Sequence, residues 1–219
     1  MIAQLTTATP TQDYPQFLQA LQASGFRGQL SADYATRTVL ATDNSIYQRL
    51  PQAAVFPLDA DDIVRIATLM AEPRFKHIKL TPRGGGTGTN GQSLTDGIVV
   101  DLSRHMNTVL EINVEERWVR VQAGVVKDQL NAALKPHGLF FAPELSTSNR
   151  ATVGGMINTD ASGQGSCTYG KTRDHVLELD SVLLGGERLH SQPLSEAELE
   201  AACAQPGRIG EVYRTARQI

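Results

Sequence analysis

The run from Thr81 to Gln92, the glycine loop, holds the residue types in this sequence that are best suited to chemistry. Glycine reaches positive φ angles at no steric cost, and it has no side chain that could block a ligand. Successive backbone N–H groups can therefore turn inward and form a concave anion site, for which phosphate is the natural ligand. The sequence predicts a phosphate-binding loop here, whose glycines are Gly84, Gly85, Gly86, Gly88 and Gly91.

Two known nucleotide-binding motifs partly match the glycine loop, and both fail on context. Gly86-x-Gly88-x-x-Gly91 has dinucleotide-binding spacing, but that motif opens a helix, whereas this chain continues into the strand-like residues 98–100. A P-loop would need a lysine where Gln92 stands, and it too would precede a helix. What remains is a loop between two strands that holds a pyrophosphate without cleaving it, which suits a cofactor better than a substrate.

A second glycine cluster lies at residues 154–170, within a region rich in Ser, Thr, Gly and Asn that begins at residue 143. Val153, Met156 and Ile157 supply apolar anchors there, which a flexible linker would not need. Small and apolar residues from 151 to 159 fit the start of a short helix whose amides face a ligand. Two clusters predict two walls of one site, and they argue against a merely flexible loop at 81–92.

The remaining titratable side chains do not form a recognisable catalytic or metal-binding set. Arg83 could clamp a phosphate or pair with a nearby carboxylate, and the sequence does not choose between these roles. The sequence predicts no metal site and leaves catalytic residues unknown. The isolated candidates are His105, His137, His175, Asp160, Cys167 and Cys203.

The elements that must position the glycine loop can be read from residue spacing. Residues 14–21 have helical spacing, residues 53–57 predict a strand, and Asp59 can cap a following helix. Residues 78–80 predict a strand that runs into the loop, and residues 98–102 a third strand. This β-α-β-loop-β order predicts a small α/β layer.

The rest of the chain supplies elements for the second cluster. Residues 109–112 and 118–122 predict a hairpin, and with it a mixed sheet. Residues 125–134 have helical character, and residues 139–142 form a brief apolar run. Residues 176–184 form a longer segment that favours a strand.

Composition argues against two classes of partner. Twenty Lys and Arg stand against 23 Asp and Glu, with no basic run, so the electrostatic signature of a nucleic-acid-binding protein is missing. No stretch approaches the roughly 18 consecutive apolar residues of a membrane helix, and the first residues do not resemble an export signal. The sequence predicts a cytoplasmic protein, with peripheral association at the inner membrane as the alternative.

Four motifs follow one another along the chain. They are Pro82-Arg83-Gly84-Gly85-Gly86-Thr87, Pro143-Glu144-Leu145-Ser146-Thr147-Ser148, Gly154-Gly155-x-x-Asn158-x-x-Ala161-x-Gly163 and Tyr169-Gly170-x-x-x-Asp174-x-Val176. In this order they resemble the FAD-binding domain of the vanillyl-alcohol oxidase and p-cresol methylhydroxylase (PCMH) type. Within that family the chain is most similar to the FAD-linked D-lactate, glycolate and D-2-hydroxyglutarate dehydrogenases, over about residues 30–190.

The resemblance implies an α+β fold in which two α/β subdomains hold FAD between them. We expect residues 1–50 to form an N-terminal helical segment. Residues 51–110 are then the first FAD-binding subdomain, and residues 111–219 the second. No cap domain and no iron–sulfur region is expected within these residues.

The same motifs imply which residues bind the cofactor. Residues 84–88 would hold the pyrophosphate and residues 89–92 would continue toward the flavin. Some relatives attach the flavin through a histidine, and because residues 81–92 contain none, we expect non-covalent FAD. Pro143, Glu144 and Ser148 would border the ring system, and Val176 would lie near the adenosine half. The full set is Pro82, Arg83, Gly84, Gly85, Gly86, Thr87, Gly88, Thr89, Asn90, Gly91, Gln92, Pro143, Glu144, Ser148, Gly154, Gly155, Asn158, Ala161, Gly163 and Val176.

The implied reaction is oxidation of a D-2-hydroxy acid to the 2-keto acid by hydride transfer to the flavin. In the family a cap domain supplies the substrate-binding, metal-binding and proton-abstracting residues, and the electron acceptor is unassigned. Residues 214–219 read as the middle of a helix, so we expect a fragment that binds FAD but is not fully active alone. Two interpretations remain open: an oxidoreductase of the same fold with another substrate, such as a sugar nucleotide or an aromatic alcohol, and a nucleotide-binding module without catalysis.

Overall fold

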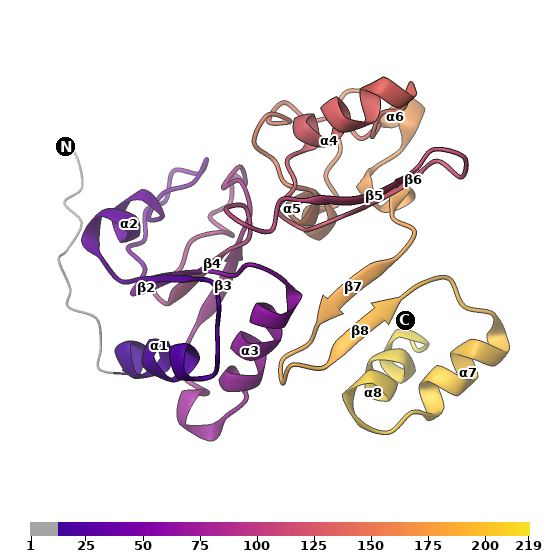
Figure 1. Ribbon diagram of the computed structural model, residues 1–219. Helices are drawn as coiled ribbons and strands as arrows, with labels where there is room; N and C mark the ends of the chain where they lie inside the picture. The colour runs from indigo at the N-terminus through magenta and orange to yellow at the C-terminus, as the bar shows by residue number, and fades with distance from the viewer. Residues whose placement is uncertain (1–12) are drawn as a thin grey trace.

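A four-stranded mixed sheet carries the glycine loop in the computed structural model, which describes residues 13–219 (Figure 1). Its strands are β1 (Gln29–Ser31), β2 (Ala53–Phe56), β3 (Leu80–Arg83) and β4 (Ile98–Asp101), in the spatial order β1-β2-β4-β3. Strands β2, β3 and β4 run parallel, and β1 is antiparallel to β2. The carboxyl ends of the parallel strands therefore share one edge of the sheet, from which β3 leads into the glycine loop.

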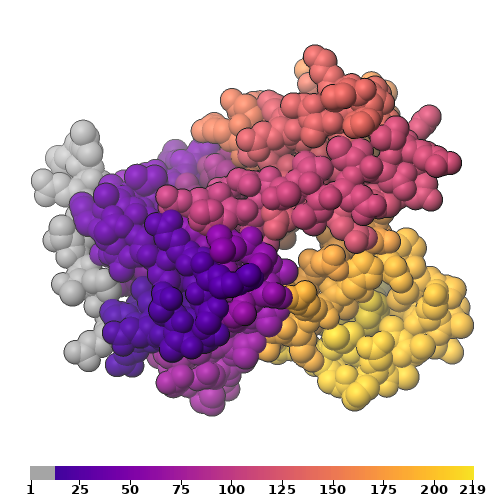
Figure 2. Space-filling view, in the orientation of Figure 1, coloured from indigo at the N-terminus to yellow at the C-terminus, as the bar shows by residue number. Residues whose placement is uncertain are grey.

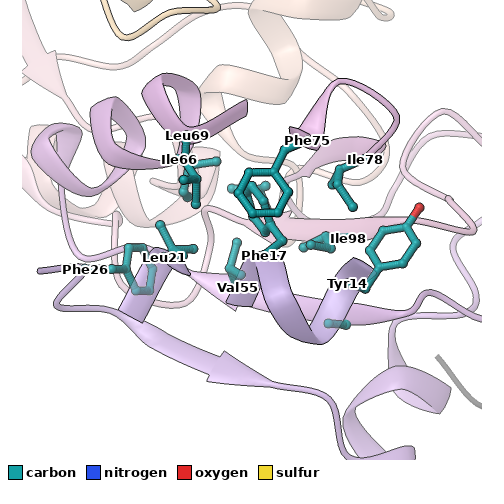
Figure 3. Packing of buried hydrophobic residues seen from close by; sticks show 12 residues of the cluster. Tyr14, Phe17, Leu21, Phe26, Val55, Ile66, Leu69, Phe75, Ile78 and Ile98 are labelled. Carbon is teal, nitrogen blue, oxygen red and sulfur yellow. The ribbon is translucent and has the colours of Figure 1, made fainter. Parts of the chain in front are cut away.

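Helices cover both faces of this sheet, which is why β2 and β4 are buried throughout. Helices α1 (Asp13–Ala23) and α3 (Ala60–Met70) pack on one face against Val55 and Ile98 (Figure 3). Phe17 of α1 meets Phe75 edge to face, with ring centroids 5.2 Å apart. On the other face Leu40, which follows helix α2 (Tyr34–Val39), packs against the alternate residues of β2 and β4.

Helix α3 begins where the sequence predicts. The Asp59 carboxylate accepts hydrogen bonds from the N–H groups of Asp61 and Asp62 at 3.0 and 3.2 Å, as an N-cap residue does. The following 3-10 helix η1 (Pro73–Phe75) then returns the chain to β3.

The connection between β3 and β4 has no helix. Residues 84–97 leave the carboxyl end of β3 and return to the amino end of β4, which runs parallel to β3. Parallel neighbours usually need a helical crossover, so a loop in this place leaves its backbone amides without helical partners.

The second half of the chain surrounds a separate core. Val125, Leu130, Leu134 and Val153 form this core, with apolar side chains of a hairpin packed against it. The elements are β5 (Val109–Asn113), β6 (Trp118–Val121), α4 (Lys127–Leu134), the 3-10 helix η2 (Lys135–His137), α5 (Val153–Thr159), α6 (Ser166–Tyr169) and the 3-10 helix η3 (Thr172–His175).

The last hairpin contacts helix α3, which covers one face of the first sheet. Strands β7 (Leu179–Val182) and β8 (Arg188–Ser191) pair antiparallel, and their turn docks on α3, where the Gly185 N–H donates to Ala67 O at 3.0 Å. Arg188 of β8 forms an ion pair with Asp61 of α3. Helices α7 (Glu196–Ala204) and α8 (Gly207–Ala216) follow (Figure 1). In Figure 2 these yellow helices, the indigo first part and the magenta-to-orange middle part form three adjoining masses.

Most elements lie where the sequence predicts them, but three differ. The mixed sheet exists, but its antiparallel strand is β1 and not the predicted hairpin, which forms its own two-stranded sheet. The expectation that 109–122 extends a mixed sheet is therefore wrong. Strand β1 lies within the segment expected to be helical; three residues with one apolar side chain give no periodic signal, and β2 supplies their partners. Residues 1–12, the start of that segment, lie outside the described residues.

The strand predicted at 78–80 is also shifted, because β3 starts at Leu80 and continues to Arg83. None of the helices described in residues 13–219 has both the length and the apolar character that a membrane span needs.

Candidate functional site

The glycine loop touches the segment before α5 through the backbone. A Cβ atom on Gly85 would lie 1.9 Å from Arg150 O, and one on Gly84 would lie 2.1 Å from Thr152 Oγ1. Real Cβ atoms do not approach other atoms this closely, so only glycine fits at these two positions. The structure thus brings the two glycine-containing regions together, as the sequence predicts.

Six consecutive amides of the glycine loop, those of residues 84–89, have no acceptor among the described residues. Residues 84–88 are half-buried. Gly86 and Gly91 have φ angles of 62° and 74°, which lie in the left-handed region that favours glycine. Because these amides have no acceptor within the described part of the chain, they are available to an anionic ligand. The donor set therefore fits the diphosphate of a nucleotide cofactor.

The start of α5 does not offer free amides. Val153 N–H donates to Val125 O at 2.8 Å, Gly154 N–H donates to Ala123 O at 2.8 Å, and Gly155 N–H donates to the hydroxyl of Thr152. The expectation that these amides face a ligand is therefore wrong, because the neighbouring chain and the N-cap side chain already accept their hydrogen bonds.

Three glycines of the second cluster differ in what surrounds them. A Cβ on Gly154 would lie 2.8 Å from the Ala123 Cβ, so this glycine allows close packing. A Cβ on Gly163 would lie 2.0 Å from Glu144 O, which brings the 161–165 stretch against the 143–148 motif. Gly155 is exposed, and a Cβ there would meet only Thr152 Oγ1, at 3.2 Å. Protein packing therefore does not explain the glycine at 155.

Arg83 lies beneath the loop and contacts protein groups. Its Nη2 donates to Thr42 O at 2.8 Å and its Nη1 to Ser93 Oγ at 3.4 Å. Burial lowers the pKa of Arg83, while the carboxylates of Asp101 and Asp43 act to raise it. A Cβ on Gly86 would lie 2.5 Å from Arg83 Nη2, so the guanidinium supports the loop from within. These contacts favour the structural role over the phosphate clamp.

The other predicted site residues are spread around this junction. Thr89, Asn90, Gln92, Glu144 and Asn158 are exposed, Pro143 is buried, and the carbonyl of Ser148 accepts from Asp128 N–H at 3.2 Å. The carbonyl of Ala161 accepts hydrogen bonds from the N–H and the hydroxyl of Thr172. Val176 follows η3 and lines a shallow cavity of about 210 Å³ with residues of β7 and β8. The structure does not join Val176 to the glycine loop by any described contact.

The acidic side chain of Asp160 is paired with basic neighbours. Arg173 and Lys171 pair with its carboxylate, and the hydrogen bond from Arg173 lowers the pKa of Asp160. In residues 13–219 no three His, Cys, Asp or Glu side chains are grouped so that they could hold a metal ion.

One contributor to the site is not predicted from the sequence. Residues 42–47 lie against the glycine loop, and the Asn44 N–H donates to Gly86 O at 3.0 Å. The only sequence signal was polar turn composition, which does not reveal a tertiary partner.

Comparison with known proteins agrees with this site. Residues 51–192 match a family model described as an FAD binding domain. The chain is 85% identical over 219 residues to the D-2-hydroxyglutarate dehydrogenase of Pseudomonas putida. This match covers 100% of this chain and 22% of that protein. The chain is 60% identical over 202 residues to the enzyme of the same name from Escherichia coli, covering 92% of this chain and 20% of that one. The chain thus spans about a fifth of the length of these relatives.

Solved structures confirm the predicted fold. An alkyldihydroxyacetonephosphate synthase superposes with a TM-score of 0.75 at 21% identity, covering 91% of this chain and 38% of that one. A variant of the Physcomitrella patens BBE-like 1 protein superposes with a TM-score of 0.70 at 20% identity, covering 84% and 39%. The family match, the high identity and the shared fold agree with the resemblance inferred from the four motifs. The chain therefore belongs to the family described as an FAD binding domain, shares its fold with these solved structures, and has FAD as its cofactor.

Proposed function

We propose that this chain is the FAD-binding part of an oxidoreductase that oxidises D-2-hydroxyglutarate to the corresponding 2-keto acid. The structural observation that carries the proposal is the row of free amides at residues 84–89 beside Arg150 and Thr152. The substrate rests on the relatives, since proteins 85% and 60% identical to this chain bear the name D-2-hydroxyglutarate dehydrogenase.

The chain's own residues bind and orient the cofactor. The amides of residues 84–89 hold the diphosphate, and residues 89–92 extend toward the flavin. The open side of Gly155, with Asn158, Ala161 and Gly163, completes the second wall. Pro143, Glu144 and Ser148 border the ring system. Bound FAD supplies the centre that accepts a hydride from the substrate's α-carbon.

The proposal also covers how the flavin is attached and which parts of the reaction this chain does not supply. Residues 81–92 contain no histidine, so the flavin is held without a covalent bond at this loop. The residues that bind substrate and take its proton belong to the part of the relatives that this chain does not span. Location in the cytoplasm, or at the inner membrane surface, stays a prediction, and the electron acceptor stays unassigned.

The first experiment is an absorption spectrum of the purified 219-residue chain before and after acid precipitation. Non-covalent FAD gives flavin absorption bands that move into the supernatant. Flavin that stays in the pellet contradicts non-covalent attachment. A chain that remains colourless after reconstitution with FAD refutes the proposed cofactor role.

The second experiment tests the reaction. The chain replaces the matching segment of the Pseudomonas putida relative, and turnover is measured with D-2-hydroxyglutarate, D-lactate and glycolate, using a redox dye as acceptor. Retained turnover of D-2-hydroxyglutarate supports the proposal. Bound FAD without turnover would assign the chain to nucleotide binding alone. The preference among the three hydroxy acids reports on the relative's substrate-binding part and serves as the control for its integrity.

A further inference from the structure

Residues 42–47 lie outside the part of the chain that matches the family model, yet they contact the glycine loop at several points. The Asn44 N–H donates to Gly86 O at 3.0 Å, and the side chain of Arg83 donates to Thr42 O at 2.8 Å. A Cβ on Gly91 would lie 3.0 Å from the Tyr47 ring. Both left-handed glycines of the loop, Gly86 and Gly91, are therefore contacted by this segment.

A hydroxyl group links the segment to the base of the loop. Ser93 Oγ donates to Asp43 Oδ2 at 2.9 Å and accepts from Arg83 Nη1 at 3.4 Å. Ser93 is 8% exposed, so water cannot readily replace these partners. The other carboxylate oxygen of Asp43 accepts the Ser45 N–H at 2.8 Å, which orients the carboxylate. Asp43, Ser93 and Arg83 thus form one connected set.

We infer that residues 42–47 are a third part of the cofactor site, which holds the glycine loop in its diphosphate-binding conformation through Asp43, Ser93 and Arg83. This inference rests on the proposed function, because it concerns the same FAD site. Asp43 and Ser93 are positioning residues: they act on the loop and not on the ligand. Free amides bind an anion tightly only when they already point toward it, and the segment supplies this preorganisation.

The test compares Ser93→Ala with a matched control in the same loop. Ser93→Ala removes the linking hydroxyl, and we expect FAD to bind about tenfold more weakly. Thr95→Val is the control, because Thr95 is buried to a similar degree, at 7% exposed, and among the described residues its hydroxyl bonds only to the Gly97 N–H, which donates to it at 3.0 Å. Thr95→Val loses one buried hydrogen bond and Ser93→Ala loses two, and only Ser93→Ala breaks the link to residues 42–47.

Three readouts separate positioning from general stability. The first is the FAD dissociation constant, measured together with the melting temperature of the FAD-free protein. The second is the ³¹P NMR spectrum of bound FAD at saturation, which reports directly on the diphosphate environment. The third is the FAD dissociation constant of the double variant Asp43→Asn, Ser93→Ala. If the two residues act as one unit, this constant should be no higher than that of the weaker-binding single variant.

The outcomes distinguish this inference from the proposed function. If the unchanged protein binds no FAD, the proposed function fails. If it binds FAD but Ser93→Ala matches Thr95→Val in affinity and in ³¹P shifts, the inference fails and the proposed function stands. A ³¹P shift with weaker binding in Ser93→Ala, absent from Thr95→Val, supports the positioning role.

Discussion

Gly85 and Arg150 meet backbone to backbone: a Cβ atom on Gly85 would lie 1.9 Å from the Arg150 carbonyl oxygen. These residues belong to regions far apart in the sequence, and their contact joins the glycine loop to the stretch that leads into α5. Among the loop positions, positive φ is confined to Gly86 and Gly91, so the glycine at 85 is required for this contact and not for backbone conformation.

Gly85→Ala should therefore separate the two regions. Relieving the overlap requires a backbone shift, and we expect a loss of about 1–3 kcal/mol in the free energy of unfolding, with loss of FAD retention. Denaturant unfolding and flavin absorbance measure the two effects. Gly138→Ala is the control: Gly138 has a φ of 67°, but a Cβ atom there would meet no other part of the protein within 4 Å, so FAD retention should survive. Unchanged affinity in Gly85→Ala would contradict the role given to this contact.

Gly155→Ala should separate cofactor binding from folding. The added methyl would meet only Thr152 Oγ1 at 3.2 Å, and alanine favours a helix over glycine by up to about 1 kcal/mol. We expect the FAD-free protein to melt at the same or a higher temperature, while FAD affinity falls because the methyl occupies the open side. If affinity is unchanged, Gly155 does not face the cofactor.

Thr152→Val should weaken the start of α5. Thr152 is the N-cap residue of this helix and is only 2% exposed. Its hydroxyl accepts a hydrogen bond from the Gly155 N–H at 3.4 Å. Valine keeps the shape but removes the acceptor, so the free energy of unfolding should fall by about 1 kcal/mol. Thr152→Ser keeps the hydroxyl and should restore the cap. Equal unfolding midpoints for the valine and serine variants would show that the cap contributes nothing.

The β7–β8 hairpin should lose stability as the pH rises above about 6.5. A hydrogen bond to Asp180 raises the pKa of His190 above 6.5, and Glu178 adds to this effect. A raised folded-state pKa means that the stabilisation is fully present below pH 6.5 and is lost as the pH passes through the folded value. The melting temperature of the protein should therefore fall between pH 6 and pH 8 by more than that of His190→Gln. Parallel curves for the two proteins would contradict the prediction.

Sequence patterns predict local structure well where the signal is local. The Asp59 cap and the apolar spacing after it predict α3, and the run at 98–102 predicts β4, because capping and periodicity depend on neighbouring residues. Strand β1 gives no such signal, since its pairing with β2 comes from a distant part of the chain. The contacts of residues 42–47 with the glycine loop are equally invisible, because their composition indicates only a turn.

The sequence by itself determined that this chain has two glycine-rich regions suited to FAD, and four ordered motifs were enough to place it in its family. The tertiary structure decided what each glycine is for. Gly85 allows a backbone contact with Arg150, Gly86 adopts a left-handed conformation above Arg83, and Gly154 packs on Ala123. The physical reason is that a missing side chain looks the same in every sequence position. Only the atoms brought near it by folding show whether the space serves packing, conformation or a ligand.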